Sequence, residues 1–246
     1  MRLASLLAML AVWYAGSQLA DPRTFPGPSA VALAMWAEGG ALPYNLAITL
    51  LRVAVSFAVA MAAGSALGLA MGRLRIVDVL VDPWLIVLLN LPALVIIVLA
   101  YVWGGITETA GIVAVVLNKL PNTAVTVREG ARSLDRGLDE MAQVFRMSAW
   151  VRLRHVVIPQ LAPYFAAATR SGLSLVWKIV LVAELLGRPD GVGAEIYTAF
   201  QLFDVARILA YAIAFVVVMA AIETFLVQPL ERRVARWRPG AARSSR

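Results

Sequence analysis

The chain has 246 residues, of which 61% are hydrophobic and 15% are charged, and its mean hydropathy is +0.79. Soluble domains contain about 45–50% apolar and about 25% charged residues, so this composition excludes a disordered chain and disfavours an ordinary soluble domain. The formal net charge is +7. With no cysteine and one histidine, the sequence excludes disulfide scaffolds, thiolate zinc sites and multi-histidine metal sites.

Residues 1–45 predict one membrane span followed by a loop. Residues 3–20 form an apolar run with Trp13 and Tyr14 near its end, where interfacial aromatic residues are common. We favour an uncleaved span; the alternative is a signal peptide cleaved at Ala15-Gly16-Ser17. Residues 21–44 are rich in proline and glycine and predict a loop that contains a short interfacial helix over residues 29–38.

Five further apolar segments predict the remaining spans, since a transmembrane helix needs about 20 apolar residues. The expected spans cover residues 46–72, 84–103, 110–127, 163–186 and 208–227. The sequence therefore predicts an all-α polytopic membrane protein with about six transmembrane helices. We expect a glycine-containing loop over residues 187–204.

Two of these segments carry signs of close helix packing. The second span has a small residue at every fourth position, which in lipid lets another helix approach closely. These residues are Ala60, Gly64, Gly68 and Gly72. The fourth span is the least hydrophobic, because it contains Asn118, Lys119, Pro121 and Asn122, and we expect it inside the bundle.

Basic residues set the orientation. With six spans and a cytoplasmic N-terminus, fifteen arginines fall on the cytoplasmic side and three on the other. This positive-inside bias places both termini in the cytoplasm. It also accounts for the net charge without a nucleic-acid partner.

The longest polar stretch, residues 128–158, predicts two short helices. Leu138, Met141, Ala142 and Phe145 are spaced as one helical face, and Ser148 is a suitable N-cap for a second helix, which we expect Pro159 to end. Such an arginine-rich, two-helix segment fits a docking surface for a cytosolic partner. The alternative is an interfacial loop that lies on anionic lipid.

The segment from Glu140 to Pro163 is similar to the EAA loop of binding-protein-dependent ABC importer permeases. That loop reads Glu-Ala-Ala, three residues, Gly, and an apolar run ending in Leu-Pro; Glu140-Met141-Ala142 and Ile158-Pro159 stand at these places. The resemblance covers about residues 46–238. Other segments resemble the nitrate/sulfonate/taurine branch: Arg52-Val53, Asn122-Thr123, Gly191-Val192-Gly193, Phe203-Asp204 and Leu230-Glu-Arg-Arg233.

The resemblance implies the type I ABC importer permease fold, with residues 1–246 as one transmembrane domain in the bacterial inner membrane. Its parts would be an N-terminal span and loop (1–45), core spans (46–228) that include a coupling loop (128–162), and a basic cytoplasmic tail (229–246). The implied partners are two cytosolic ABC ATPase subunits, a periplasmic solute-binding protein and a second permease copy. A homodimer is favoured, and a heterodimer remains open.

The resemblance also assigns residues to the ATPase contact. Glu140 would be a polar anchor in a cleft of the ATPase, and Met141, Ala142 and Phe145 would form the packed face beside Arg146 and Ser148. One residue departs from the family pattern, because Arg146 stands where the family has a turn glycine. Arg146 must turn with ordinary backbone angles or at a steric cost.

The chain itself has no phosphate-binding loop and no enzyme active site that we can identify. Its only lysines, Lys119 and Lys178, follow Asn118 and Trp177, so no Gly-Lys-Ser/Thr occurs. If ATP drives transport, another subunit must bind it. We expect no catalytic residue, metal or cofactor in this chain.

Charges within the spans suggest a solute pathway, because intramembrane charges are costly. Arg170, Ser174 and Lys178 share one face of the fifth span. We hypothesise that Lys178, with Lys119 or Arg170, lines the pathway and favours an anion such as nitrate, a sulfonate or taurine. The alternatives are an ion pair between Lys178 and Glu223, or extension of the Arg52 and Arg170 side chains to the membrane surface.

A stand-alone secondary transporter is the main alternative function. It would use Lys178, Glu184 and Glu223 as ion-coupling groups. The cytoplasmic two-helix segment favours the importer, because a stand-alone carrier does not need a docking surface for a cytosolic partner.

Overall fold

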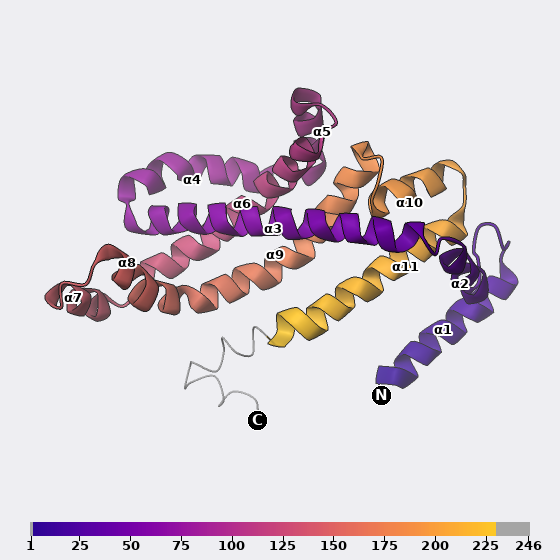
Figure 1. Cartoon of the computed structure of the whole chain (residues 1–246), viewed down its shortest axis with the longest axis horizontal. Coiled ribbons are helices and arrows are strands. Elements are labelled where there is room, and N and C mark those ends of the chain that lie inside the picture. Colours follow the sequence, from indigo (N-terminus) through magenta and orange to yellow (C-terminus); the bar gives the residue numbers. More distant parts are fainter. Residues whose placement is uncertain (1, 230–246) are drawn as a thin grey trace. The chain divides into compact units, whose positions relative to one another are not determined.

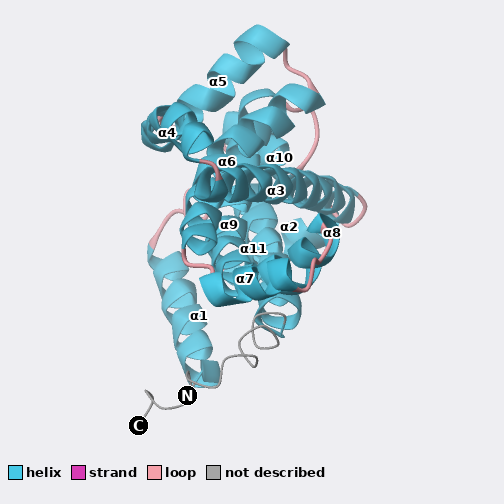
Figure 2. Cartoon of the chain, turned by 90° about the vertical axis from the view of Figure 1, so that its left-hand side faces the viewer, coloured by secondary structure: helices cyan, strands magenta, loops and turns pink. Residues whose placement is uncertain are grey.

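The computed structural model describes residues 2–229, and every regular element in that range is a helix (Figure 1 and Figure 2). The predicted all-α class is confirmed. Nearly all of the expected basic tail, residues 230–246, lies outside the described residues. The helices are α1 (Arg2–Leu19), α2 (Pro28–Ala37), α3 (Ala41–Arg73), α4 (Arg75–Asn90), α5 (Ala93–Gly104), α6 (Glu108–Arg132), α7 (Arg136–Val144), α8 (Ala149–Arg152), α9 (Ile158–Gly187), α10 (Val192–Gln201) and α11 (Val205–Ile222), with π-helical turns η1 (Leu153–Val157) and η2 (Glu223–Val227).

Four helices are long and apolar enough to cross a membrane, which makes the chain a multi-pass membrane protein. They are α3 with 33 residues, α6 with 25, the continuous helix Ala149–Gly187 with 39, and Val205–Val227 with 23. The pair α4 and α5 adds a fifth span if the two are taken together. The expected first span corresponds to the helix α1, but its apolar part, Leu7–Leu19, is shorter than these spans and is not one of the helices long enough to cross a membrane among the described residues.

The expected third span is sharply bent. Its first helix, α4, begins at Arg75 rather than near Trp84, and α4 and α5 meet at 103°. Leu91 has extended backbone angles (φ −74°, ψ 130°), because the proline that follows it disfavours the helical conformation. Pro92 then stands at the N-cap of α5. A single proline therefore converts one apolar run into two helices.

Residues 2–52 and 180–222 form one compact unit. In it α11 packs against both α2 and α10, with Tyr211 and Phe215 buried. The predicted helix over residues 29–38 is present as α2. The predicted loop over residues 187–204 is wrong, because it contains α10. Side chains from two other helices cap the N-terminus of α10, a stabilisation that local composition does not reveal.

Residues 53–179 and the described residues from Glu223 onward form the other unit, in which α6 is central. The helix α6 packs against α4 and α5. Its residues Val127 and Ala131 join Val157 and Leu161 in one buried cluster. It also continues through Pro121 without a break, and its residues at that level are largely buried, as expected for the least hydrophobic span.

The small residues of α3 lie against α6. Ala60 is fully buried, and a Cβ atom at Gly64 would lie 2.7 Å from Cβ of Thr123. At Gly68 a Cβ atom would overlap the carbonyl oxygen of Ala124, and at Gly72 it would overlap the side chain of Ala131. The two helices therefore approach more closely than larger residues would permit.

The prediction that Pro159 ends the helix before the fifth span is wrong. The helix runs without interruption from Ala149 to Gly187 and includes both Pro159 and Pro163. Immediately before Pro159, η1 widens the helix to π geometry. The wider turn changes which carbonyl faces the proline ring, and this relieves the clash that a proline makes inside a regular α-helix.

We predict that Gly68→Val destabilises the protein by about 1–3 kcal/mol, because the larger side chain would overpack the α3–α6 contact. Ala66→Val is the matched control, since Ala66 lies on the exposed side of the same helix. Thermal unfolding in detergent measures both variants. Equal melting temperatures for the two variants would contradict the close packing of these helices.

Candidate functional site

Residues 133–157 lie between α6 and α9 and form the two short helices that the sequence predicts. The carboxylate of Asp135 accepts a hydrogen bond from the backbone N–H of Gly137 (2.7 Å) and caps α7. The hydroxyl of Ser148 accepts one from the backbone N–H of Val151 (3.4 Å) and caps α8. Both helices therefore begin at side chains that satisfy unpaired N–H groups.

The predicted contact residues of α7 divide into exposed and buried ones. Glu140 is exposed, and Met141 and Phe145 are 41% and 70% exposed. Ala142 is 1% exposed and faces the interior. Ser148, besides capping α8, is exposed. This exposed apolar surface on a polar segment is the type of surface that binds a partner protein.

Arg146 has the backbone conformation of a turn glycine. Its φ is +49°, in the left-handed region that is costly for residues with a Cβ atom. The N–H of Arg146 bonds to the carbonyl oxygen of Gln143 (2.9 Å), and the N–H of Met147 bonds to that of Ala142 (3.0 Å). These two bonds form a Schellman motif at the end of α7. Arg146 therefore turns the chain at a steric cost and not with ordinary backbone angles, which were the two outcomes expected from the sequence.

Two hydrogen bonds attach this segment to α9. The hydroxyl groups of Ser133 and Tyr164 are 2.7 Å apart, and the backbone N–H of Asp135 donates to the side-chain oxygen of Gln160 (2.9 Å). The ring of Tyr164 also packs against Gly130, where a Cβ atom would not fit. The start of the segment is therefore fixed to both α6 and α9.

Arginines at the end of α6 also pair with the first turns of α4. Arg128 pairs with Asp78 (3.4 Å) and with Asp82, and Arg132 pairs with Asp78 (2.5 Å). Arg132 is 44% exposed, so its pair adds little stability, whereas Arg128 is 14% exposed. These pairs fix the end of α6 that leads into α7.

The structure brings three of the four predicted pathway residues to one exposed face of α9. Arg170, Ser174 and Lys178 are all exposed. The hydroxyl of Ser174 donates to the carbonyl oxygen of Ser171 (3.2 Å). Within residues 2–229, no ion pair joins Lys178 to Glu223, so that alternative is not supported.

Lys119, the fourth predicted pathway residue, is fully buried. Its Nζ donates to Oδ1 of Asn122 (2.9 Å) and to the carbonyl oxygen of Ala168 in α9 (3.1 Å). Its side chain packs directly on Gly172, where a Cβ atom would overlap it. Within the described part of the chain, Lys119 has no carboxylate partner. Its Nζ is hydrogen-bonded only to neutral acceptors.

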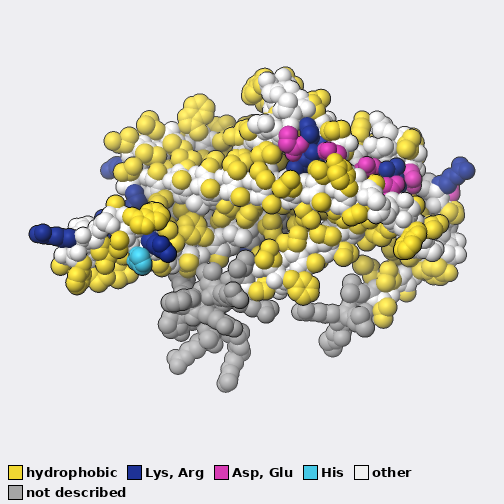
Figure 3. Space-filling view, viewed as in Figure 1, with side chains coloured by type: hydrophobic (Ala, Val, Ile, Leu, Met, Phe, Trp, Pro, Cys, Tyr) yellow, Lys and Arg dark blue, Asp and Glu magenta, His cyan; other side chains and the backbone are white. Residues whose placement is uncertain are grey.

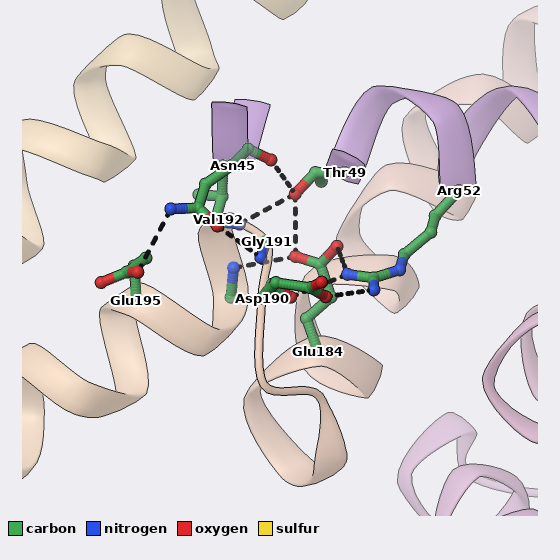
Figure 4. Close-up of polar contacts among 9 residues, drawn as sticks. Asn45, Thr49, Arg52, Glu184, Asp190, Gly191, Val192 and Glu195 are labelled. Atoms are coloured by element: carbon green, nitrogen blue, oxygen red, sulfur yellow. Dashed lines mark hydrogen bonds and ion pairs between the residues drawn. The ribbon is translucent and has the colours of Figure 1, made fainter. Parts of the chain in front are cut away.

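A buried ion pair, which the sequence did not predict, joins α3 to α9 (Figure 4). Nη1 of Arg52 lies 2.8 Å from Oε1 of Glu184, and the exposed fractions of the two side chains are 9% and 1%. Arg52 also donates to the backbone oxygen of Asp190 (2.8 Å) and pairs with its carboxylate. The alternative in which Arg52 extends to the membrane surface is therefore not supported, because Arg52 pairs with Glu184 and Asp190 inside the protein.

The same network caps the N-terminus of α10 (Figure 4). The backbone N–H groups of Gly191 and Val192 donate to the side chains of Asn45 and Thr49, each at 2.8 Å. The N–H of Gly193 donates to Oε2 of Glu184 (2.9 Å). A carboxylate at this position also complements the positive end of the helix dipole. Each of these side chains thus accepts a hydrogen bond from a backbone N–H group that would find no acceptor in lipid.

Glycine is required at the start of α10. Gly191 has φ +103°, and a Cβ atom there would overlap the carboxylate of Glu184. The sequence signal for this network was a polar stripe on an apolar helix. Asn45, Thr49 and Arg52 follow one another at intervals of four and three residues, which places them on one face of α3.

A second charged cluster lies beside this network in the same unit. Arg207 pairs with Glu38 (3.1 Å) and Glu195 (2.7 Å), and the hydroxyl of Tyr211 donates to Glu38 (2.9 Å). The side chain of Asn45 donates to Glu195 (3.2 Å) and so connects the two clusters. Among residues 2–229, no group of three His, Cys, Asp or Glu side chains could hold a metal ion.

Comparison with known proteins identifies relatives along almost the whole chain. A family model described as "Binding-protein-dependent transport system inner membrane component" matches residues 60–236. A protein of Escherichia coli (strain K12) named as the aliphatic sulfonates transport permease protein SsuC is 31% identical over 237 residues, covering 95% of this chain and 90% of that protein. A Bacillus subtilis (strain 168) protein of the same name is 27% identical, covering 94% and 84%. The taurine transport system permease protein TauC of Escherichia coli (strain K12) is 27% identical, covering 95% and 88%.

We predict that Glu184→Gln and Arg52→Met each destabilise the protein by about 3–5 kcal/mol, because either change leaves one buried charge uncompensated. The double variant should lose less than the sum of the two, since it removes both charges. Asp190→Asn is the control, with a smaller expected loss because that side chain is 31% exposed. The free energies of unfolding of the wild type, the two single variants and the double variant, measured in detergent, form a double-mutant cycle. Strictly additive losses would show that the two residues do not interact.

Proposed function

The chain belongs to the family of binding-protein-dependent transport system inner membrane components, as its coupling-loop resemblance predicts, and on this premise we propose that it is the membrane-spanning permease subunit of an ATP-driven ABC importer. The solute that we propose is a small anion of the sulfonate or taurine type. The names of the Escherichia coli and Bacillus subtilis relatives support this solute class. In this proposal residues 1–246 act as one transmembrane domain.

The observation that carries the proposal is the α7–α8 segment. It leaves the membrane-spanning helices between α6 and α9, where the family has its coupling loop, and it exposes Met141, Phe145 and Glu140. In our proposal an ATPase cleft receives α7, with Glu140 as the polar anchor and Met141 and Phe145 as the packed face. Ala142, which the resemblance also assigns to that face, is buried within the chain and packs α7 from inside. The short α8 continues directly into α9, so a displacement of α7 acts on a membrane-spanning helix.

The importer needs partners on both sides of the membrane. We propose two cytosolic ATPase subunits at the coupling loops, a second permease copy in the membrane, and a periplasmic protein that delivers the solute. The positive-inside bias of the sequence supports cytoplasmic termini. ATP-driven closure of the ATPases would then favour one of two conformations of the permease pair, open to one side or the other.

We propose that the exposed polar face of α9 lines the solute pathway. Arg170, Ser174 and Lys178 lie on it, and residues 167–178 contain no acidic side chain. A lysine this deep in a span is too costly to face lipid, so this face requires a water-filled path or a partner. Lys119 adds a further positive charge on the buried side of α9. Together these groups favour an anionic solute.

The contacts of Glu184 argue against the secondary-transporter alternative, in which Glu184 would be an ion-coupling group. An ion-coupling carboxylate must exchange its partner during transport, whereas both oxygens of Glu184 are occupied by Arg52, Thr49 and the N–H of Gly193. Glu184 in this arrangement stabilises the start of α10. We therefore do not propose ion coupling for it.

We predict that a P-loop ATPase co-purifies with the wild-type chain, extracted in mild detergent from its own host, and is lost with Glu140→Arg. The reversed charge would disrupt the polar anchor of the docked α7. Gln201→Arg is the control, because it adds a charge at an exposed position of α10, outside the coupling loop. Mass spectrometry identifies the bound proteins. Absence of an ATPase from the wild type, under conditions that preserve a known importer complex, would refute the proposal.

We predict that Lys178→Met raises the KM for sulfonate uptake about tenfold, the size expected when a hydrogen bond to a charged group is lost. Leu175→Met is the matched control, because Leu175 is an exposed neighbour on the same helix. Uptake of a radiolabelled alkanesulfonate by cells that contain equal amounts of assembled transporter measures the effect. An unchanged KM would remove Lys178 from the pathway.

A further inference from the structure

Arg146 occupies the most conformationally demanding position of the coupling loop. Its φ of +49° is the conformation that glycine adopts without steric cost at the end of a helix. The backbone hydrogen bonds of the turn need only the N–H groups of residues 146 and 147, so they do not require an arginine side chain. The guanidinium group therefore adds nothing to the turn. At this position arginine is less favourable for folding than glycine would be.

The positive charge of Arg146 is not neutralised within the described chain. Arg146 is exposed and forms no ion pair there, and the same is true of Arg154 on the same segment. Residues 136–158 contain four arginines and two acidic residues. In Figure 3, basic side chains protrude from the part of the molecule that carries α7 and α8. The surface is thus cationic as well as apolar.

We propose that Arg146 forms a bidentate ion pair with a carboxylate group of the ATPase cleft that receives α7. This inference rests on the proposed function and adds the chemistry of the partner, which is an acidic group opposite the end of the helix. The planar guanidinium fork binds a carboxylate through two parallel hydrogen bonds, which a lysine cannot reproduce. Val144 and Phe145, which are 80% and 70% exposed beside it, would exclude water from the pair once docked and so strengthen it.

An anionic lipid surface is the competing source of negative charge, and α7 itself argues against it. Glu140 is exposed on the same short helix, so its carboxylate would be repelled by lipid phosphate groups. A protein cleft can place a donor opposite Glu140 and a carboxylate opposite Arg146, whereas a uniformly anionic surface cannot. The mixed charge of α7 therefore favours a protein partner.

The test compares three substitutions of one residue. Arg146→Gly removes both the steric cost and the charge, Arg146→Asn tolerates the left-handed turn without charge, and Arg146→Lys keeps the charge. We measure binding of the purified ATPase subunit, the one recovered with the wild-type chain, to each full-length variant in phosphatidylcholine nanodiscs. We expect Gly and Asn to weaken binding about tenfold and to reduce its dependence on salt, and Lys to retain part of the affinity.

Stability measurements separate this effect from misfolding. Arg146→Gly should unfold at the same or a higher temperature than the wild type, because glycine relieves the turn. Phe203→Gly is the matched control. Phe203 has φ +55° in an equivalent turn at the end of α10, so the same relief is expected there without a change in ATPase binding.

Cross-linking identifies the partner group directly. Both lysines of the chain lie in membrane-spanning helices, so Arg146→Lys places a single reactive amine on the coupling loop. A carbodiimide joins an amine to a carboxylate that contacts it. We expect a cross-linked peptide between position 146 and an Asp or Glu of the ATPase, and no such peptide in the wild type, whose guanidinium group does not react.

The outcomes distinguish this inference from the proposed function. If Arg146→Gly binds the ATPase as tightly as the wild type, with the same salt dependence, the ion pair does not exist, while loss of binding with Glu140→Arg would leave the importer proposal standing. If the variants differ only in nanodiscs that contain phosphatidylglycerol, the negative group is lipid and the inference is wrong. If the wild type binds no ATPase, the proposed function itself fails.

Discussion

The ion pair between Arg52 and Glu184 is the interaction on which the unit of residues 2–52 and 180–222 depends. Bilayer and protein interior offer no water, so a charge placed there must find its counter-charge and all its hydrogen bonds within the fold. Glu184 meets that requirement with one arginine, one hydroxyl and one backbone N–H. These contacts come from α3 and from the first turn of α10, so a single carboxylate holds α3, α9 and α10 in one arrangement. The close approach explains why Gly191 cannot carry a side chain.

The same requirement distinguishes charges that stabilise the fold from charges that are available for function. Arg52 and Glu184 neutralise each other and are nearly inaccessible. Lys178 is exposed on a membrane-spanning helix without an ion pair among residues 2–229, and Lys119 is buried with only neutral acceptors. Positive charge that the fold leaves unbalanced attracts anions. The polar face of α9 is therefore a better candidate for solute contact than the more numerous charges of the Arg52 and Arg207 clusters.

Local signals in the sequence predicted those parts of the structure that depend on local physics. Apolar runs located the long helices, Ser148 marked the start of α8, and spacing predicted the helix α7, although Ala142 of the predicted face is buried while Met141 is exposed. The errors arose where distant groups decide the outcome. The N-terminus of α10 is capped by α3 and α9, and Pro159 is accommodated by the π-helical turn before it. The partners of Arg52 lie 132 and 138 residues away, so only the polar stripe of α3 could have indicated them.

The continuous helix Ala149–Gly187 places the two candidate functional surfaces on one element. Its first turns belong to the segment that we propose as the coupling loop, and Lys178 lies in its membrane-spanning part. At 1.5 Å per residue, the distance along the helix from Trp150 to Lys178 is roughly 40 Å, more than the hydrocarbon thickness of a bilayer. A helix transmits displacement well along its axis, and here the weakest part of its hydrogen bonding, with η1 and two prolines, lies close to the coupling loop. The fixed contacts of Tyr164 and Gln160 with residues 133 and 135 span this weak region. If α7 docks on an ATPase as we propose, these contacts would pass a force on α7 to α9 beyond the region that would bend, toward the polar face that carries Lys178.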